Sequence, residues 1–507
     1  MFNTDNRNPL PSTLTRRIVG LALCVASLAS ACSSDDPTGP VQGMGGFTTG
    51  GTAPGTGASG GANPGGAGPG SGGFGTGSGP VGSGGFVGSG GAGGGAGGGP
   101  GSGGATGGTS GSGGAGVTGG AGGSSGGGTG LGPLTRADGF VDAAPPLGAK
   151  LPAAAPGTWT WVDVPEMKCR DGSASGLYVR YGTSKNFFIY LEGGGVCLND
   201  FFCGINPKNV NQTQNAESIL AGAAGMPAVK QAPGNDGIFK NDPRNPVKDW
   251  NAVYVPYCTG DIWGGNKPNA TFPPGFEGLG GNTTGQHQFV GFNNTSIVLG
   301  RVAATFPDGD KSLITGSSAG GIGALLNAHR LADLMRKQGS RSRGFVVSDS
   351  AVPFKDDFLA TCTQKIWRDL WGLNPSFPSD CPDCFPASGG SLATGLASYF
   401  TKKFPNENEV LGGLISSADD EIIKFFYGAG LPGCTPTTYT AGTTYPNALK
   451  DFRDNIVGKK RFGTYFLPGT LHMHLWRARF YETNGGTMTI ADWLGKILNN
   501  EPVHVGL

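Results

Sequence analysis

Five short runs of apolar, β-branched and aromatic residues recur along the chain between positions 187 and 467. They are residues 187–191 (FFIYL), 252–257 (AVYVPY), 312–315 (SLIT), 345–348 (FVVS) and 464–467 (TYFL). Continuous apolar runs of this length are typical of strands that are buried on both faces of a parallel sheet. Two further segments, 158–164 and 176–182, predict an antiparallel hairpin that leads into this sheet.

A helical pattern lies between the third and fourth runs. Within residues 320–338, apolar side chains recur on one side at helical spacing, and Gly339 follows a basic last turn, which indicates the helix end. The apolar positions are Ile322, Leu325, Ala328, Ala332 and Met335. Strands that alternate with helices predict an α/β fold with a mainly parallel central sheet flanked by helices.

Composition divides the chain into three parts. Of the 507 residues 98 are glycine, and residues 41–132 are nearly all Gly, Ser, Ala, Thr and Pro. Such a segment has too few large apolar side chains to offset its chain entropy, so we expect a flexible coil. We assign residues 1–31 to a signal peptide, 32–133 to a disordered Gly/Ser-rich tether and 134–507 to one large domain.

The N-terminus predicts export. Arg16 and Arg17 precede a short apolar run, residues 18–30, and small residues lead to Cys32. This arrangement resembles a bacterial lipoprotein signal, so we expect Cys32 to be lipidated and to anchor the protein in the outer membrane or at the cell surface. The alternative is an ordinary secretory signal that is cleaved nearby. A formal net charge of +1 gives no indication of a nucleic-acid partner.

Cysteine usage agrees with an exported domain. Outside the N-terminal segment eight cysteines remain, and an even number in an oxidising compartment predicts disulfides. A C-x-x-C pair at 381–384 has neither a second such pair nor a nearby histidine, so a structural disulfide is favoured over zinc, and no metal or cofactor is expected. The eight are Cys169, Cys197, Cys203, Cys258, Cys362, Cys381, Cys384 and Cys434.

A candidate nucleophile follows the third apolar run. Residues 316–320 read GSSAG, and they join a predicted strand directly to a predicted helix. A Gly-x-Ser-x-Gly turn in this setting is the nucleophile elbow of serine hydrolases, in which the turn is too tight for side chains beside the serine. The spacing selects Ser318, with Ser317 at the variable position. The N–H of Ala319 would contribute to an oxyanion hole.

The chain order Ser, acid, His of this fold class narrows the choice of a base. Of five histidines, His287 precedes the elbow, His504 lies three residues from the chain end, and His329 stands about 16 Å along the helix from the serine. His472 and His474 remain, in the loop after the last predicted strand. We favour His472 because it is nearer the strand end.

The sequence offers several candidates for the acid and one glycine-rich loop for the remaining oxyanion donors. Asp419, Asp420 and Glu421 follow an apolar run, and Asp349 ends a predicted strand, so spacing alone leaves the acid open. An acidic cluster at a helix start is also often an N-cap. Three glycines, 193–195, follow the strand at 187–191 directly and predict an oxyanion loop.

Three of these segments together resemble the pectinacetylesterase family, which includes pectin acetylesterases and Notum-like carboxylesterases. They are YLEGGGVC (190–197), WNAVYVPYCTGDIWGG (250–265) and GSSAGGIGALLNAHRLAD (316–333). The resemblance covers most of residues 159–480 and implies an α/β-hydrolase-like fold with a Ser-Asp-His triad that cleaves O-acyl esters without a metal. It implies Ser318 as nucleophile, Asp420 as acid, His472 as base, and Gly194, Gly195 and Ala319 as oxyanion donors.

The resemblance carries further implications and one departure. It implies a disulfide between Cys197 and Cys203 and a place for Trp263 near the pocket mouth. Many family members have a cysteine two or three residues before the histidine, where this chain has Gly469 and Thr470, so His474 stays open as the base.

We therefore expect an exported serine carboxylesterase that acts on O-acyl esters, foremost O-acetyl groups on pectin or another polysaccharide. The alternatives are a lipase-like esterase for longer acyl chains and a non-catalytic surface protein for carbohydrate binding or adhesion.

Overall fold

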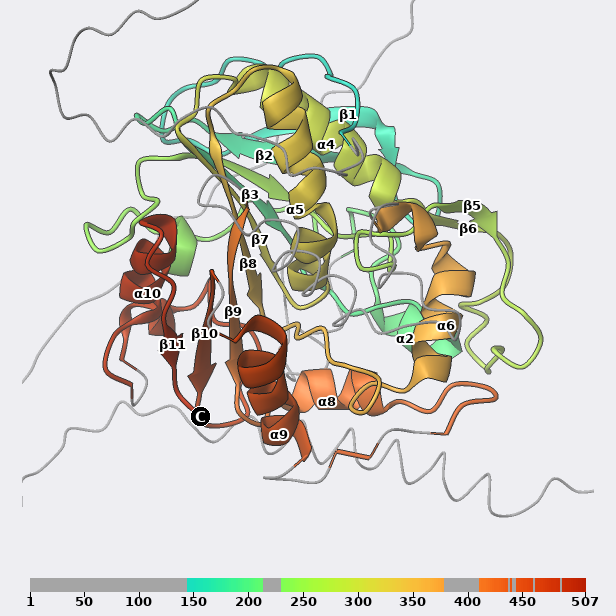
Figure 1. Cartoon of the computed structure of the whole chain (residues 1–507). Coiled ribbons are helices and arrows are strands. Elements are labelled where there is room, and N and C mark those ends of the chain that lie inside the picture. Colours follow the sequence, from blue (N-terminus) through green and yellow to red (C-terminus); the bar gives the residue numbers. More distant parts are fainter. Residues whose placement is uncertain are drawn as a thin grey trace, which may run out of the picture. The chain divides into compact units, whose positions relative to one another are not determined.

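The computed structural model describes residues 144–212, 229–377, 410–435, 438–439, 444–458, 461–483 and 486–507 (Figure 1). The signal peptide, the lipidation of Cys32 and the tether lie outside the described residues and stay predictions, as does a disulfide between Cys381 and Cys384. Among the described residues, no helix combines the length and apolar character that crossing a membrane requires.

A nine-stranded sheet forms the centre of the fold, with strand order β1-β2-β4-β3-β7-β8-β9-β10-β11 (Figure 1). The strands are β1 Thr160–Lys168, β2 Ala174–Arg180, β3 Phe187–Leu191, β4 Asn251–Val255, β7 Lys311–Ser317, β8 Arg343–Asp349, β9 Leu411–Ser417, β10 Phe462–Leu467 and β11 His504–Val505. A separate two-stranded sheet pairs β5 Lys267–Ala270 with β6 His287–Phe289.

The mainly parallel sheet is confirmed. The β1–β2 hairpin and the β2–β4 pair are antiparallel, and every other pairing in the nine-stranded sheet is parallel. The five apolar runs became β3, β4, β7, β8 and β10. Their side chains have no polar face because both faces of the sheet are covered.

Strand β3 shows how the sheet separates two apolar layers. Phe187, Ile189 and Leu191 pack in the layer that contains α4 and α5, whereas Phe188 and Tyr190 pack in the layer that contains α10. Helices therefore cover both faces, as the alternation of elements predicted (Figure 1). This is the α/β-hydrolase-like architecture expected from the sequence.

The helix after β7 is confirmed at almost its predicted bounds, as α5 Ala319–Lys337. Its end is formed by Gly339, whose φ of 77° lets its N–H donate to the carbonyl of Arg336. Within the described residues, the other helices are α2 Asp200–Ile205, α4 Gly291–Thr305, α6 Thr361–Trp371, α8 Glu421–Gly428, α9 Thr444–Asp451 and α10 Ile490–Leu498, with a π-helical segment Phe452–Val457 and 3-10 turns Gly237–Phe239, Asn374–Ser376 and Ala478–Tyr481.

Disulfides join the described cysteines in three pairs, which confirms the expectation from their number. The pairs are Cys169–Cys258, Cys197–Cys203 and Cys362–Cys434. The Cys197–Cys203 bridge is the pair that the family resemblance implied, and it closes the segment immediately after the triglycine loop.

Candidate active site

Ser318 occupies a strained turn between β7 and α5. Strand β7 ends at Ser317, α5 begins at Ala319, and Ser318 itself has a φ of 56° and a ψ of −127°. A non-glycine residue rarely adopts this backbone, and such strain at a strand-to-helix turn is the signature of a nucleophile elbow. The N–H of Gly321 donates to the Ser318 carbonyl at 2.8 Å and starts the helix at once.

The two glycines that flank the serine are required by the end of β3. A Cβ on Gly316 would lie 2.4 Å from the Leu191 carbonyl oxygen, and a Cβ on Gly320 would lie 2.0 Å from the same atom. Both contacts are with backbone, which has little room to move. The Gly-x-Ser-x-Gly pattern therefore reflects the close approach of the elbow to β3, which the triglycine loop follows after Glu192.

The triglycine loop has a backbone that favours glycine and is held by several contacts. Gly194 and Gly195 have φ angles of 148° and 75°. The Asn206 side-chain amide donates to the Gly194 carbonyl at 2.9 Å. Arg170 donates in turn to the carbonyls of Cys203 and Asn206, at 2.9 and 2.7 Å. These contacts fix the loop beside the elbow.

Arg170 and Asn206 were not anticipated from the sequence. Both side chains are buried, and the Arg170 guanidinium is stripped of water, which lowers its pKa to about 10. Single buried polar residues leave no periodic pattern to detect. The nearest signal was Cys203, three residues before Asn206, because the bridge to Cys197 returns the chain to the loop.

Trp263 departs from its expected place. Only 1% of the residue is exposed, so it lies in the core and not at a pocket mouth. Its indole Nε1–H donates to the Glu192 carbonyl at 3.0 Å, and a Cβ on Gly323 of α5 would meet the indole at 2.6 Å. Trp263 thus packs between the start of the triglycine loop and α5.

The loop after β10 brings His472 onto Asp420. The His472 Nδ1 lies 2.8 Å from Oδ2 and 3.0 Å from Oδ1 of the Asp420 carboxylate. An ionised carboxylate only accepts hydrogen bonds, so Nδ1 carries the proton in this pair. In the neutral ring Nε2 is then the nitrogen with a lone pair, which is the tautomer that a general base needs.

Asp420 is also the N-cap of α8. Its Oδ1 accepts from the backbone N–H groups of Ile422 and Ile423, at 3.1 and 3.0 Å, and the residue is fully buried. The helix start compensates the buried negative charge with its N–H groups and its dipole. The sequence left two interpretations of this acidic cluster, a helix N-cap and a triad acid. Asp420 has the contacts that both of them require.

The other acidic candidates have different partners. Asp419 forms a partly exposed ion pair with Lys424 at 2.8 Å, and Glu421 is the first residue of α8. Asp349, at the end of β8, accepts from the backbone N–H groups of His474 and Leu475. In the geometry, Asp420 is thus the carboxylate that contacts the His472 ring.

The remaining histidines are engaged elsewhere. His474 is buried, with Nε2 3.2 Å from the Ser417 hydroxyl, and burial lowers its pKa. His329 is buried within α5, which lowers its pKa to about 3. His504 lies in the edge strand β11 with Nε2 2.9 Å from the Gly458 carbonyl, and His287 lies in β6.

The pectinacetylesterase family model matches residues 157–386. The resemblance seen in the sequence is confirmed. Similar curated proteins include the palmitoleoyl-protein carboxylesterase notum2 of Xenopus laevis, 30% identical over 237 residues (43% of each chain). The palmitoleoyl-protein carboxylesterase NOTUM of Schmidtea mediterranea is 31% identical over 278 residues, which are 51% of this chain and 48% of the relative.

These matches cover only part of the chain and part of each relative. The chain spans about a third to a half of the length of the curated relatives it matches most strongly. The pectinacetylesterase match includes the triglycine loop and Ser318 but ends before Asp420 and His472. The acid and the base are therefore supported by their own geometry.

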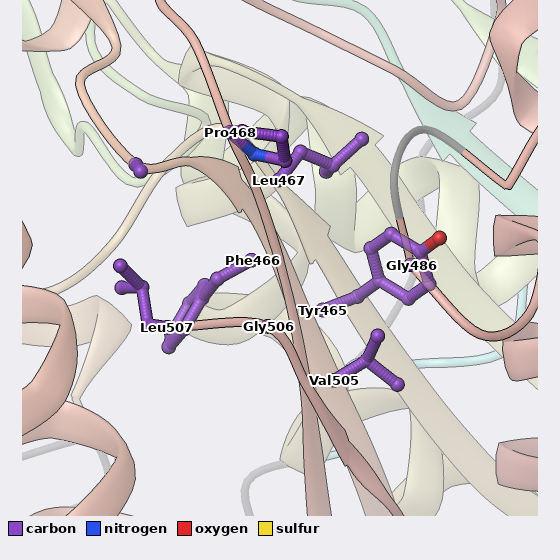
Figure 2. Close-up of a pocket in the computed structure, with 9 residues that line it drawn as sticks. Tyr465, Phe466, Leu467, Pro468, Gly486, Val505, Gly506 and Leu507 are labelled. Atoms are coloured by element: carbon purple, nitrogen blue, oxygen red, sulfur yellow. The ribbon is translucent and has the colours of Figure 1, made fainter.

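A small pocket lies between β10, β11 and the segments beside them (Figure 2). Its volume is about 200 Å³, and none of its lining residues is a candidate catalytic residue. Leu467 and Pro468 line it at the start of the loop that leads to His472 (Figure 2). The other lining residues are Ala418, Tyr465, Phe466, Gly486, Val505, Gly506 and Leu507.

Proposed function

We propose that this protein is an exported serine carboxylesterase that hydrolyses O-acyl esters through Ser318, His472 and Asp420. The observation that carries the proposal is the hydrogen-bonded Asp420–His472 pair, which follows β9 and β10 at the sheet edge where the Ser318 elbow follows β7. The chain order Ser, Asp, His is that of α/β-hydrolases. The pectinacetylesterase match and the carboxylesterase names of the relatives support the same reaction class.

In this mechanism His472 accepts the Ser318 hydroxyl proton through Nε2 as Oγ attacks the ester carbonyl carbon. Asp420 holds the ring in the required tautomer and stabilises the imidazolium that forms. The oxyanion is stabilised by the backbone N–H groups of Gly194, Gly195 and Ala319, each worth about 3 to 4 kcal/mol in comparable enzymes. His472 then protonates the leaving alcohol, and water releases the acyl group by the reverse sequence.

Labelling with a fluorophosphonate probe tests this proposal. Folded wild-type protein should be phosphonylated, and Ser318→Ala should not be, although Ser317 is still present next to it. Loss of the nucleophile should reduce kcat about 10⁶-fold. A folded wild-type protein that neither labels nor hydrolyses esters would instead support the non-catalytic binding protein.

We propose acetyl groups on pectin or another polysaccharide as the substrate, since the matched family is named for that reaction. Relatives named palmitoleoyl-protein carboxylesterases favour a second candidate, a longer acyl chain. A series of p-nitrophenyl esters from acetate to palmitate separates the two. A kcat/KM that falls steeply beyond butyrate supports the acetylesterase, and one that rises with chain length supports the alternative.

We also propose that Cys32 is lipidated and anchors the enzyme in the outer membrane or at the cell surface. The motif around Cys32 and the Gly/Ser-rich segment after it support this proposal. Replacing Cys32 with Ala should abolish incorporation of radiolabelled palmitate and shift the protein from the membrane fraction. Unchanged fractionation would contradict the anchor.

A further inference from the structure

Asp349 stands at the junction between the nucleophile elbow and the histidine loop. It ends β8 and pairs in register with Ser317, the last residue of β7. Its backbone carbonyl accepts from the N–H of Ser318 at 2.8 Å. The residue is fully buried, so its carboxylate needs protein donors to replace water.

The Asp349 carboxylate finds these donors on both sides of the junction. Its Oδ2 accepts from the Ser317 hydroxyl at 2.6 Å, on the elbow side. The same oxygen accepts from the backbone N–H groups of His474 and Leu475, at 2.8 and 3.0 Å, on the loop side. Hydrogen bonds to an ionised acceptor are roughly twice as strong as neutral ones, so this carboxylate ties the two segments together firmly.

Ser350 extends the junction by one residue. Its hydroxyl donates to the Asp349 Oδ1 at 3.1 Å and accepts from the N–H of Met473 at 2.8 Å. Residues 349 and 350 therefore bind the N–H groups of all three residues that follow His472. Ser350 and Met473 have φ angles of 54° and 63°, a strained backbone that persists only where surrounding contacts enforce it.

We propose that Asp349 is a positioning residue which, with Ser350, fixes the His472 loop relative to the Ser318 elbow. The proposal rests on the function proposed above. Asp349 acts through backbone N–H groups and not on the reacting atoms, because the carboxylate that contacts the His472 ring belongs to Asp420. Its role is to set the position from which the ring reaches the serine.

The first variant is Asp349→Asn, which keeps the shape but replaces one acceptor oxygen with an NH₂ donor. We expect kcat to fall about 10- to 100-fold, because small displacements of a catalytic group cost this much. KM for a p-nitrophenyl ester should change less than about threefold, since substrate binding does not use this carboxylate. The rate of fluorophosphonate labelling should fall by the same factor as kcat.

Two serine variants, Ser350→Ala and its control Ser348→Ala, test the same role in case Asp349→Asn does not fold. Ser350→Ala removes the hydroxyl that binds the Met473 N–H, and we expect kcat to fall about 5- to 20-fold. Ser348→Ala, two residues earlier and equally buried, removes a hydroxyl that donates to the Ala351 carbonyl at 3.1 Å. It should lower the melting temperature to a similar extent but leave kcat within about twofold.

The outcomes separate the two proposals. Equal kcat losses in Ser350→Ala and Ser348→Ala, or a wild-type kcat in folded Asp349→Asn, would overturn the positioning role while Ser318 still labels. Failure of the wild-type protein to label would overturn the proposed function and the positioning role with it. A kcat loss confined to Asp349→Asn and Ser350→Ala, with KM retained, supports positioning.

Discussion

The carboxyl ends of β8 and β9 present two buried aspartates that use their carboxylates differently. The two strands are parallel neighbours in the sheet. Asp349, at the end of β8, and Asp420, three residues beyond β9, are both fully buried, and both contact the loop that follows β10. Asp420 contacts the His472 ring, whereas Asp349 contacts backbone N–H groups two and three residues further on.

Burial and position therefore do not distinguish the two carboxylates; in the proposed function, the donor that each carboxylate meets does. An imidazole N–H belongs to a ring that gains and loses a proton, so a carboxylate beside it stabilises the charge that forms during catalysis. A backbone N–H does not titrate, so the carboxylate beside it only fixes a conformation. In the proposed function, the same sheet edge therefore supplies both roles from adjacent strands.

The largest effect that tests this comparison is expected at the two histidines. His472→Ala should reduce kcat about 10⁵- to 10⁶-fold, because the serine loses its base. His474→Gln, which keeps the backbone N–H that Asp349 binds, should reduce kcat no more than about tenfold. Steady-state kinetics with p-nitrophenyl acetate measure both, and the reverse order of the two losses would assign the base to His474.

The next effect is expected at the two aspartates. Asp420→Asn should lower kcat about 10⁴-fold, because an amide stabilises the wrong histidine tautomer. Its melting temperature should change little, since asparagine is as good an N-cap as aspartate. The adjacent Asp419→Asn is the control, because it removes only a partly exposed ion pair with Lys424 and should leave kcat within about twofold.

The comparison is broken if Asp349→Asn loses more activity than Asp420→Asn. The triad acid would then belong to β8, and the hydrogen bond between Asp420 and His472 would serve only to order the loop. Equal losses of kcat in Asp419→Asn and Asp420→Asn would likewise show that the contact between Asp420 and the His472 ring has no particular role in catalysis.

The sequence predicted the features whose cause is local. Continuous apolar runs marked β3, β4, β7, β8 and β10 because each of these strands is covered on both faces. The elbow was visible because the approach of β3 demands glycine at both 316 and 320. His472 was favoured by elimination along the chain, which needs only strand order and the length of α5, and its role as the base stays a prediction.

Features set by distant contacts escaped prediction. Strand β9 was not recognised as a strand because it contains Gly412 and Gly413, where a Cβ would meet the rings of Phe462 and Trp493 at 2.2 and 2.4 Å. The glycines make room for these rings and dilute the apolar pattern. Spacing likewise left Asp349 and Asp420 open, since it does not encode which donor a buried carboxylate meets.

The charges around His474 set the smallest expected effect, a dependence of stability on pH. Burial lowers the pKa of His474, against the opposing influence of the carboxylates of Asp349 and Asp420, while the neighbouring His472 and Arg479 lower it further. An unfolded histidine titrates near 6.5. Between that value and the lower folded pKa, the unfolded chain binds more protons than the folded protein, so the free energy of unfolding rises with pH.

The contribution of neutral His474 to the free energy of unfolding should therefore be fully present above about pH 7 and should decline as the pH falls below about 6.5. His474→Gln removes this titration and should flatten the decline by no more than about 1.4 kcal/mol for each unit by which the folded pKa is lowered. Urea unfolding at pH 7.5, 6.0 and 5.0 measures it. His329→Gln is the control, because burial and the neighbouring Arg330 lower the pKa of His329 to about 3 with the same sign, and neither aspartate is among the groups that shift it. The contrary outcome is that His474→Gln leaves the fall of the unfolding free energy at low pH unchanged while His329→Gln reduces it. Protonation of His474 would then not oppose folding, and only the hydrogen bonds of Asp349 and Ser350 would hold the loop after β10.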